Sequence, residues 1–318
     1  MLARALSHVP PSDRIALAIL GVSAATYTAA LSGGRPILEL WAIYAGLFAA
    51  YGALVAILAR SGSRPWVPAA RAVGTLGVIF ALYLSLSTVF RAIPWNADPF
   101  LARLDARLFF GLSPALLADS VATYAVREFF SFAYVGFLPF LYTLIFLGLF
   151  RRSSDERDDF LTGFALTYAL SYLGYLFLPA HGPIAQHAAE FAPGVEKGFF
   201  QRLATSAVDL GGGPHGAFPS LHVGTTAFFC LFDWKRDRRR GLLCAPFVVL
   251  FAVATVFVKY HYAVDLAAGV AIAVFASVAG PRWAAAWRAR REAASEAAEV
   301  FRNLRPAERL RLGAAARR

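Results

Sequence analysis

Histidine is the side chain best suited to proton transfer or nucleophilic attack near neutral pH, and this chain of 318 residues has six. Two of them lie in informative local patterns. His222 ends a glycine-rich stretch, GGGPHGAFPSLH at 211–222, and His261 lies in KYHYAVD at 259–265. These two segments are the first candidates for a catalytic site.

The stretch at 211–222 reads as a flexible loop that leads into a helix. Proline suits the first position of a helix, so we expect a helix to begin at Pro219, with Ser220 and His222 in its first turn. Unpaired N–H groups and the positive end of the helix dipole favour an anion there, especially phosphate. Taken alone, the stretch is equally compatible with a plain loop before a helix.

The second segment places a carboxylate beside a histidine. His261 and Asp265 are four residues apart, so on a helix they share a face. The carboxylate can then accept one ring N–H and leave the other nitrogen free as a nucleophile. The pair is also compatible with a hydrogen bond that only satisfies two buried polar groups. Two histidines and an aspartate can bind zinc, but no tight ligand pair supports a metal here, and we expect none.

Composition indicates which elements must position these residues. Hydrophobic residues make up 58% of the chain, charged residues only 16%, and the mean hydropathy is +0.55. A membrane-spanning helix needs about 20 apolar residues. We therefore predict an all-α, polytopic membrane bundle of about eight transmembrane helices. The predicted spans are 15–32, 37–59, 72–91, 128–150, 160–179, 219–232, 242–258 and 264–280.

Lysine and arginine predict the orientation, because they concentrate in cytoplasmic loops. The loops and ends on one side of the predicted spans hold 23 of the 31 Lys and Arg residues. Both termini are therefore expected in the cytoplasm and the site on the extracytoplasmic face, as in a bacterial inner (plasma) membrane protein. The net charge of +11 is then mainly a topology signal, and no nucleic-acid partner is expected. The segments predicted to be cytoplasmic are 1–14, 60–71, 151–159, 233–241 and 281–318.

The histidines gather on the opposite side of this map. Five of the six fall in extracytoplasmic loops or in the first turn of a helix entering from that side. A single membrane histidine is usually a packed group, but such a cluster indicates a site of chemistry. The five are His181, His187, His215, His222 and His261. A further segment, 98–120, predicts a helix lying in the outer membrane interface.

Together the two histidine segments resemble a known family. AFPSLH at 217–222 and HYAVD at 261–265 resemble the second and third motifs of the type 2 phosphatidic acid phosphatase superfamily. Leu221 and the His-Tyr-x-x-Asp form are similar to one branch, the inositol phosphorylceramide synthases and their bacterial relatives, as is LPAHGP at 178–183. The resemblance covers 72–280 as a six-helix core. Residues 1–71 would add two N-terminal transmembrane helices, and 281–318 a basic, helical cytoplasmic tail.

The resemblance implies an enzyme without cofactors that acts on a membrane lipid phosphate or phosphodiester. His261 would attack phosphorus and form a phosphohistidine, with Asp265 orienting it. His222 would protonate the leaving alcohol and then activate the acceptor, a hydroxyl group or water. Ser220 would help to hold phosphate oxygens. Transfer of an inositol phosphate-like headgroup to a lipid hydroxyl is the activity typical of this branch.

The chain also departs from the superfamily pattern. The superfamily places Ser-Arg shortly before the nucleophile, where this chain has Ala254 and Thr255, and the Lys and Arg of the first motif are missing. Phosphoryl transfer needs positive charge near the phosphate. The candidates for substrate binding are Lys259, Lys197 and Arg202, with His181 and His215 as possible substitutes.

Two alternatives stay open at this stage. The chain could be a plain lipid phosphate or polyprenyl-phosphate hydrolase, which the same phosphohistidine would serve. It could also be a non-catalytic transporter or scaffold that retains the fold. A transporter should have charged or broken helices near the bilayer midplane, whereas the polar groups here gather at one face. The oligomeric state is not indicated.

Overall fold

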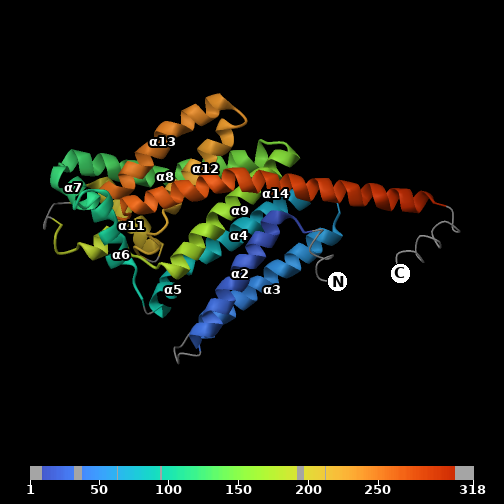
Figure 1. Cartoon of the computed structure of the whole chain (residues 1–318), viewed down its shortest axis with the longest axis horizontal. Coiled ribbons are helices and arrows are strands. Elements are labelled where there is room, and N and C mark those ends of the chain that lie inside the picture. Colours follow the sequence, from blue (N-terminus) through green and yellow to red (C-terminus); the bar gives the residue numbers. More distant parts are fainter. Residues whose placement is uncertain are drawn as a thin grey trace.

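The computed structural model describes residues 9–31, 38–62, 64–93, 95–191, 197–211 and 213–304, and this part of the chain is helical throughout (Figure 1). The predicted all-α fold is therefore confirmed. The helices are α2 (Pro11–Leu31), α3 (Leu38–Arg60), α4 (Val67–Leu84), α5 (Leu86–Ala92), α6 (Asp98–Leu108), α7 (Pro114–Val121), α8 (Tyr124–Phe150), α9 (Ser154–Phe177), α10 (Pro183–Gln186), α11 (Phe199–Leu210), α12 (Leu221–Trp234), α13 (Arg238–Phe257) and α14 (Ala263–Asn303).

Over the described residues, six helical segments are long and apolar enough to cross a membrane, which confirms a polytopic protein. The other two predicted spans correspond to α2 and to α12, which has only 14 residues. The six are Trp41–Arg60, Val67–Phe90, Tyr124–Phe150, Ser154–Phe177, Arg238–Phe257 and Ala263–Ala297.

Helix α9 lies at the centre of the bundle and packs against α14, α12 and α2 (Figure 1). Glycines let these backbones approach closely, as small residues do between membrane helices. A Cβ on Gly280 of α14 would lie 2.5 Å from the Cα of Gly163 on α9. A Cβ on Gly269 would lie 2.5 Å from the backbone oxygen of Ser220. This close packing fixes the start of α12 relative to the start of α14, where His222 and His261 lie.

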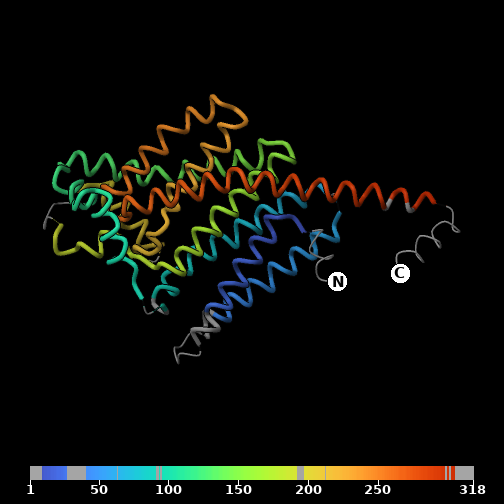
Figure 2. Tube along the Cα trace, in the orientation of Figure 1, coloured from blue at the N-terminus to red at the C-terminus, as the bar shows by residue number. Residues whose placement is uncertain are grey.

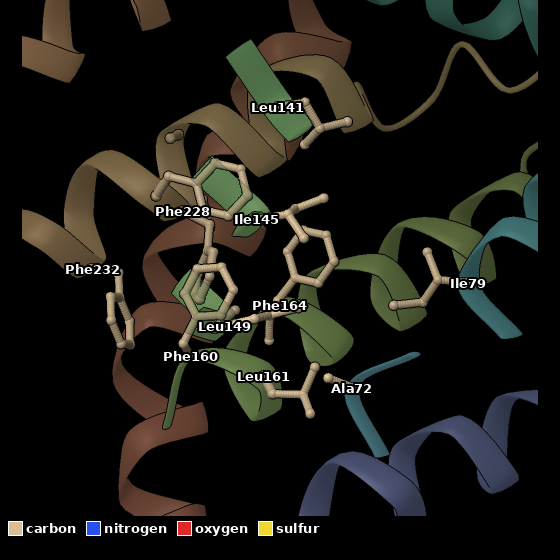
Figure 3. Packing of buried hydrophobic residues seen from close by; sticks show 14 of the residues in the cluster. Ala72, Ile79, Leu141, Ile145, Leu149, Phe160, Leu161, Phe164, Phe228 and Phe232 are labelled. Atoms are coloured by element: carbon tan, nitrogen blue, oxygen red, sulfur yellow. The ribbon is translucent and has the colours of Figure 1, made fainter. Parts of the chain in front are cut away.

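An aromatic cluster holds α9 against α12 and α8 (Figure 3). Phe160 and Phe164 of α9 are stacked with ring centroids 5.9 Å apart. Phe228 and Phe232 of α12 are fully buried against Phe160. Burying a side chain of this size contributes about 1.5–3 kcal/mol each relative to exposure in water, although a lipid solvent reduces this gain. The cluster makes α9 and α12 a rigid support for the residues at their ends.

Helices α2 and α3 lie side by side along one edge of the bundle (Figure 2). The hydroxyl of Tyr51 donates to Asp13 at 3.0 Å, and Arg71 at the start of α4 pairs with Asp13 at 3.1 Å. These contacts attach the two N-terminal helices to the rest of the bundle. At the other terminus, α14 continues through Pro281 to Asn303 without the break expected near 281, and 305–318 lie outside the described residues.

Ion pairs gather at one end of the bundle, which we call the arginine end. Asp159 pairs with Arg236 at 2.7 Å and with Arg288 at 2.8 Å, and Arg152 pairs with Asp233. These pairs bring together 151–159, 233–241 and the middle of α14, three segments that were predicted to share one side of the membrane. The histidines of the two motifs lie at the opposite end, which we call the histidine end.

Candidate active site

A cavity of about 210 Å³ opens at the histidine end. Its lining includes four of the five histidines predicted on this side: His181, His215, His222 and His261. The fifth, His187, pairs with Glu190 at 2.6 Å and does not line the cavity. Segments separated by up to 80 residues in sequence therefore meet around one space.

The hydrogen bonds of His261 determine which ring nitrogen can react. Nδ1 lies 2.8 Å from the backbone oxygen of Ala217, and a carbonyl oxygen can only accept a hydrogen bond. Nδ1 must therefore carry the proton, so Nε2 of the neutral ring holds a lone pair. Burial, followed by the proximity of His222, lowers the pKa of His261 to about 3, which keeps the ring neutral. His261 thus presents a nucleophilic nitrogen.

Asp265 supports His261 as expected, but as a secondary acceptor. Its Oδ2 lies 3.4 Å from Nδ1 of His261, farther than the oxygen of Ala217, and it accepts the backbone N–H of Tyr262 at 2.8 Å. Asp265 is fully buried. It therefore fixes both the histidine and the turn that begins α14.

His222 is the closest polar neighbour of the reactive nitrogen. Its Nδ1 lies 3.2 Å from Nε2 of His261, and because Nε2 accepts, Nδ1 of His222 donates. The ring packs between Phe137, at 4.5 Å between centroids, and Tyr134, at 5.1 Å. Two facing imidazoles, one an acceptor and one a donor, suit a nucleophile and an acid.

Helix α12 begins at Leu221, two residues later than predicted, because Ser220 is its N-cap. The Ser220 Oγ accepts the N–H of Val223 at 3.4 Å, and its own N–H donates to the backbone oxygen of Asp265 at 3.0 Å. Ser220 is fully buried and does not line the cavity. Ser220 thus joins the segment of His222 to that of His261. Its contact with phosphate stays a prediction.

Asp98, which sequence reasoning did not single out, holds His181 in place. Its carboxylate is fully buried and accepts the backbone N–H of His181 at 2.9 Å, that of Gly182 at 2.8 Å and the hydroxyl of Tyr262 at 3.1 Å. Nδ1 of His181 lies 3.3 Å from the same carboxylate. Burial raises the pKa of Asp98, but hydrogen bonds from His181, Gly182 and Tyr262 outweigh it and lower the pKa overall. The cavity thus contains a second histidine–carboxylate pair.

Asp105, two turns further along α6, attaches this helix to the start of α14. Its two oxygens accept the N–H groups of Ala263 at 2.9 Å and Val264 at 2.8 Å. Burial raises the pKa of Asp105, and these two hydrogen bonds partly offset the rise. The signal in the sequence was the spacing of seven between Asp98 and Asp105, which places both on one face of a helix.

The segment predicted as one helix at 98–120 is in fact two helices, α6 and α7.

The turn at Gly182 explains why this position lacks a side chain. Its φ of +94° lies in the region that favours glycine, and a Cβ there would lie 2.4 Å from the backbone oxygen of Tyr260. The close approach brings the segment of His181 against the segment of His261. This is the structural role of the LPAHGP stretch.

The structure does not bring the three predicted cationic residues into the histidine cavity. Lys259 pairs with Asp119 at 2.7 Å, Lys197 lines a different cavity, and Arg202 donates to the backbone oxygen of Lys197. Among the described residues, those that line the histidine cavity include no lysine or arginine. His181 and His215, whose rings lie 5.2 Å apart, line the same cavity as His222 and His261.

The remainder of the cavity wall is apolar and aromatic. It comes from α4, α8 and α9, and several of these side chains, including Leu84, Leu138 and Tyr142, are also exposed on the outside of the bundle. The cavity therefore joins a histidine cluster to a surface suited to acyl chains. In the described part of the chain, no group of three or more His, Cys, Asp or Glu side chains is arranged to hold a metal ion.

The PAP2 superfamily, that of the type 2 phosphatidic acid phosphatases, matches residues 99–279, more than half of the chain. The chain belongs to the PAP2 superfamily. This membership confirms the coarser part of the resemblance, the superfamily itself. The phosphatase-type, metal-independent activity that the superfamily implies stays a prediction for this chain. The match includes His181, His215, His222, His261 and Asp265 but begins after Asp98, later than the expected start at 72.

A relative is also known. A PA-phosphatase related-family protein of Dictyostelium discoideum is 28% identical over 131 residues, which are 40% of this chain and 24% of the relative. The matched part is thus about a quarter of that protein. No solved structure matches this chain. Neither match reaches the inositol phosphorylceramide synthase branch, so that finer placement stays a prediction.

Proposed function

We propose that this PAP2 superfamily member cleaves the phosphate ester of a membrane lipid through a phosphohistidine on His261, and passes the phosphoryl group to water or to a hydroxyl acceptor. The observation that carries the proposal is the arrangement of the His261 ring. Nδ1 donates to the backbone oxygen of Ala217, so the lone pair of Nε2 faces the cavity and His222.

In the first half-reaction, Nε2 of His261 attacks phosphorus and the bond from phosphorus to the lipid oxygen breaks. The departing oxygen needs a proton, which His222 donates once both of its ring nitrogens are protonated. The hydrogen bond from His222 to Nε2 must break to admit the phosphate between the two rings, which are 5.4 Å apart at their centroids. The negative charge of the phosphate then favours the protonated form of His222.

In the second half-reaction, water or a hydroxyl group attacks the phosphorus of the phosphohistidine. His222 takes the proton of the attacking oxygen, and the bond between Nε2 and phosphorus breaks. The same two histidines therefore serve both halves. Asp265 and Ala217 keep Nδ1 of His261 in place and favour the positive charge that the ring carries while it is phosphorylated.

Positive charge for the phosphate oxygens would come from His181 and His215. Both line the cavity that His222 and His261 also line, and the carboxylate of Asp98 holds the ring of His181 in place. Backbone N–H groups at the start of α12 would add to this charge. This arrangement would replace the missing Lys and Arg of the first motif.

The apolar walls of the cavity support a lipid as the substrate. Phe80 of α4 and Tyr142 of α8 are stacked at 6.1 Å on the side of the cavity that reaches the bundle surface. A phosphate among the histidines would leave its acyl or polyprenyl chains against these side chains. In the bilayer, the lipid would come from the extracytoplasmic leaflet if the predicted orientation holds.

The identity of the acceptor distinguishes hydrolysis from transfer. Transfer of a headgroup phosphate, inositol phosphate-like, to a lipid hydroxyl is favoured by the HYAVD and LPAHGP stretches. An apolar cavity would also admit a lipid acceptor. Hydrolysis of a lipid phosphate or polyprenyl phosphate needs only water in the same place.

The test is to incubate the purified protein with a panel of phosphorylated lipids, with and without inositol or a lipid alcohol, and identify the products that contain phosphorus. Inorganic phosphate alone would assign hydrolysis, and a new phosphorylated alcohol would assign transfer. The His261→Ala variant is the control and should form neither. Turnover of no lipid by the wild-type protein would refute the proposed function and leave a transporter or scaffold.

A further inference from the structure

A second cavity, of about 110 Å³, lies beside the histidine cavity at the same end of the bundle. Tyr260, the residue before His261, lines both cavities, so its side chain is part of the wall between them. The second cavity is polar, unlike the first. Its lining residues are Arg127, Ser131, Ile184, Lys197, Gln201, Ala204, Thr205, Phe257, Val258, Lys259 and Tyr260.

Two of its three cations share one carboxylate. Arg127 Nη1 lies 2.6 Å and Lys259 Nζ 2.7 Å from the same oxygen, Oδ1 of Asp119. Asp119 and Arg127 are both buried, so these charges are held in place. One carboxylate balances only one of the two cations, and the group carries a formal charge of +1.

Lys197 adds a second positive charge at the rim of the cavity. Glu128 of α8 lies against Gly198, the residue after Lys197. Its carboxylate accepts the N–H groups of Phe200 at 2.9 Å and Gln201 at 3.0 Å. With Asp119 and Glu128 counted against Arg127, Lys259 and Lys197, the formal charge of these five side chains is +1.

Hydrogen-bond donors are also in excess. Arg127 uses one N–H of Nη1 and one of Nη2 on Asp119, and Nε donates to the backbone oxygen of Ala122 at 3.1 Å. A guanidinium has five N–H donors, so these contacts leave two for a ligand. A guanidinium N–H is a charged donor, which suits a phosphate oxygen.

The backbone at Lys259 is held in an uncommon conformation. Its φ of +68° is rare for a residue with a side chain. Three contacts fix it. The ammonium group pairs with Asp119 and lies 4.1 Å from the ring centroid of Phe191. The backbone oxygen of Lys259 accepts the N–H of Ile184 at 2.8 Å. Such constrained residues concentrate at binding sites. Here the constraint directs the ammonium group of Lys259 away from the histidine cavity and into the second one.

We propose that the second cavity is a binding site for a phosphate group, separate from the histidine site, with Lys197, Arg127 and Lys259 as its ligands. The group could arrive as free inorganic phosphate or on a lipid headgroup, because the chemistry that recognises both is the same. This site would bind phosphate whether or not His261 forms a phosphohistidine. Its position across Tyr260 suits an anion that leaves or awaits entry to the histidine cavity.

The experiment measures binding of radiolabelled inorganic phosphate to the full purified chain in detergent, by equilibrium dialysis. The His261→Ala protein is used throughout, because it cannot turn over a phosphate ester. We expect two classes of site. Lys197→Met should weaken one class at least tenfold, because a hydrogen bond to a charged group is worth about 1.5–3 kcal/mol. His181→Ala should weaken only the other class.

The control variant is Arg107→Met, which removes one exposed positive charge of α6 at the same end of the bundle but outside both cavities. It should change neither class. If phosphate binds in a single class that His181→Ala removes and Lys197→Met leaves intact, the second site does not exist, and the proposed function is unaffected. If the protein binds phosphate only in the class that Lys197→Met weakens, and no class depends on His181, the second site stands and the proposed function is contradicted.

A second arm identifies the source of the phosphate group. Dihexanoyl phosphatidic acid, kept below its micelle concentration, is added to the same His261→Ala protein with bound phosphate. Displacement from the class that depends on Lys197 would assign a lipid headgroup. Displacement only from the class that depends on His181 would assign free phosphate to the second site. Either result supports the site, since both require a class that Lys197→Met weakens.

Discussion

Replacing Asp98 with asparagine tests whether His181 supplies positive charge to the site. Oδ1 of Asp98 accepts from Gly182, from Tyr262 and, at 3.1 Å, from the backbone of His181, and Oδ2 accepts from the backbone and ring of His181. In Asp98→Asn, an NH₂ group in place of Oδ2 faces the backbone N–H of His181, so that contact is lost. A hydrogen bond to a charged group is worth about 1.5–3 kcal/mol, which predicts a loss of about this size in stability.

The same change removes the carboxylate that holds the backbone and the ring of His181 in place at the cavity. Loss of one charged donor to the transferring group costs about 10²–10³-fold in kcat. We therefore expect kcat of Asp98→Asn, measured as phosphate release from a lipid substrate well below its unfolding temperature, to fall by about a hundredfold.

Asp105→Asn is the matched control on the same face of α6. It removes hydrogen bonds to Ala263 and Val264 and so lowers stability, but Asp105 contacts no histidine of the cavity. Its kcat should fall less than that of Asp98→Asn. A kcat of Asp98→Asn within about threefold of the wild type would refute this account of His181.

Three further predictions concern metals, sidedness and acid stability. EDTA should leave activity intact and vanadate should inhibit it; loss of activity with chelator, restored by zinc or magnesium, would contradict the proposed mechanism. A cysteine at Lys197 should react with an impermeant thiol reagent in intact cells, whereas one at Arg238 should not, and the reverse pattern would invert the topology. The pKa of His261 is about 3 in the fold and about 6.5 when unfolded, so the unfolded state binds more protons between these values. The unfolding temperature should therefore fall as the pH drops below about 6.5, and fall less in His261→Gln; equal acid sensitivity of the two proteins would contradict a neutral buried ring.

Hydropathy predicted where the helices lie better than where they end. The span predicted at 72–91 is two helices, α4 and α5, which meet at Ser85, whose hydroxyl donates to the backbone oxygen of Leu82 at 2.7 Å. The span predicted to end at 280 continues in α14 through Pro281. Side-chain hydrogen bonds and packing decide such boundaries, and a hydropathy average contains neither.

The catalytic pair was predictable because it depends on local spacing and on a motif. Its main hydrogen bond was not. The acceptor for Nδ1 of His261 is the oxygen of Ala217, 44 residues away in sequence, and only the packing of α12 against α14 brings it there. The spacing of four indicated Asp265, but His261 lies before α14 begins at Ala263, so the two residues do not share a helix face and the contact comes from the turn at the start of that helix. The oxygen of Ala217 also lies closer.

Lys259 and Asp98 show the limits of sequence proximity. Lys259 is two residues from His261, but its left-handed backbone and the pair with Asp119 direct it into another cavity. Asp98 is 83 residues from His181, yet it holds both the backbone and the ring of that histidine. The sequence assigned Lys259 to the site because it is a cation on the predicted outer side, and it did not single out Asp98.

The phosphohistidine is the central claim, and trapping it is the most direct test. The purified protein is mixed with phosphatidic acid labelled with ³²P in the phosphate, quenched in alkali during the first turnover, and the label on the protein is counted. A phosphate on a histidine nitrogen survives alkali and is lost in acid. We predict alkali-stable, acid-labile label on the wild type and none on His261→Ala. Label of equal amount on His261→Ala, or turnover by the wild type with no label on the protein, would contradict the mechanism.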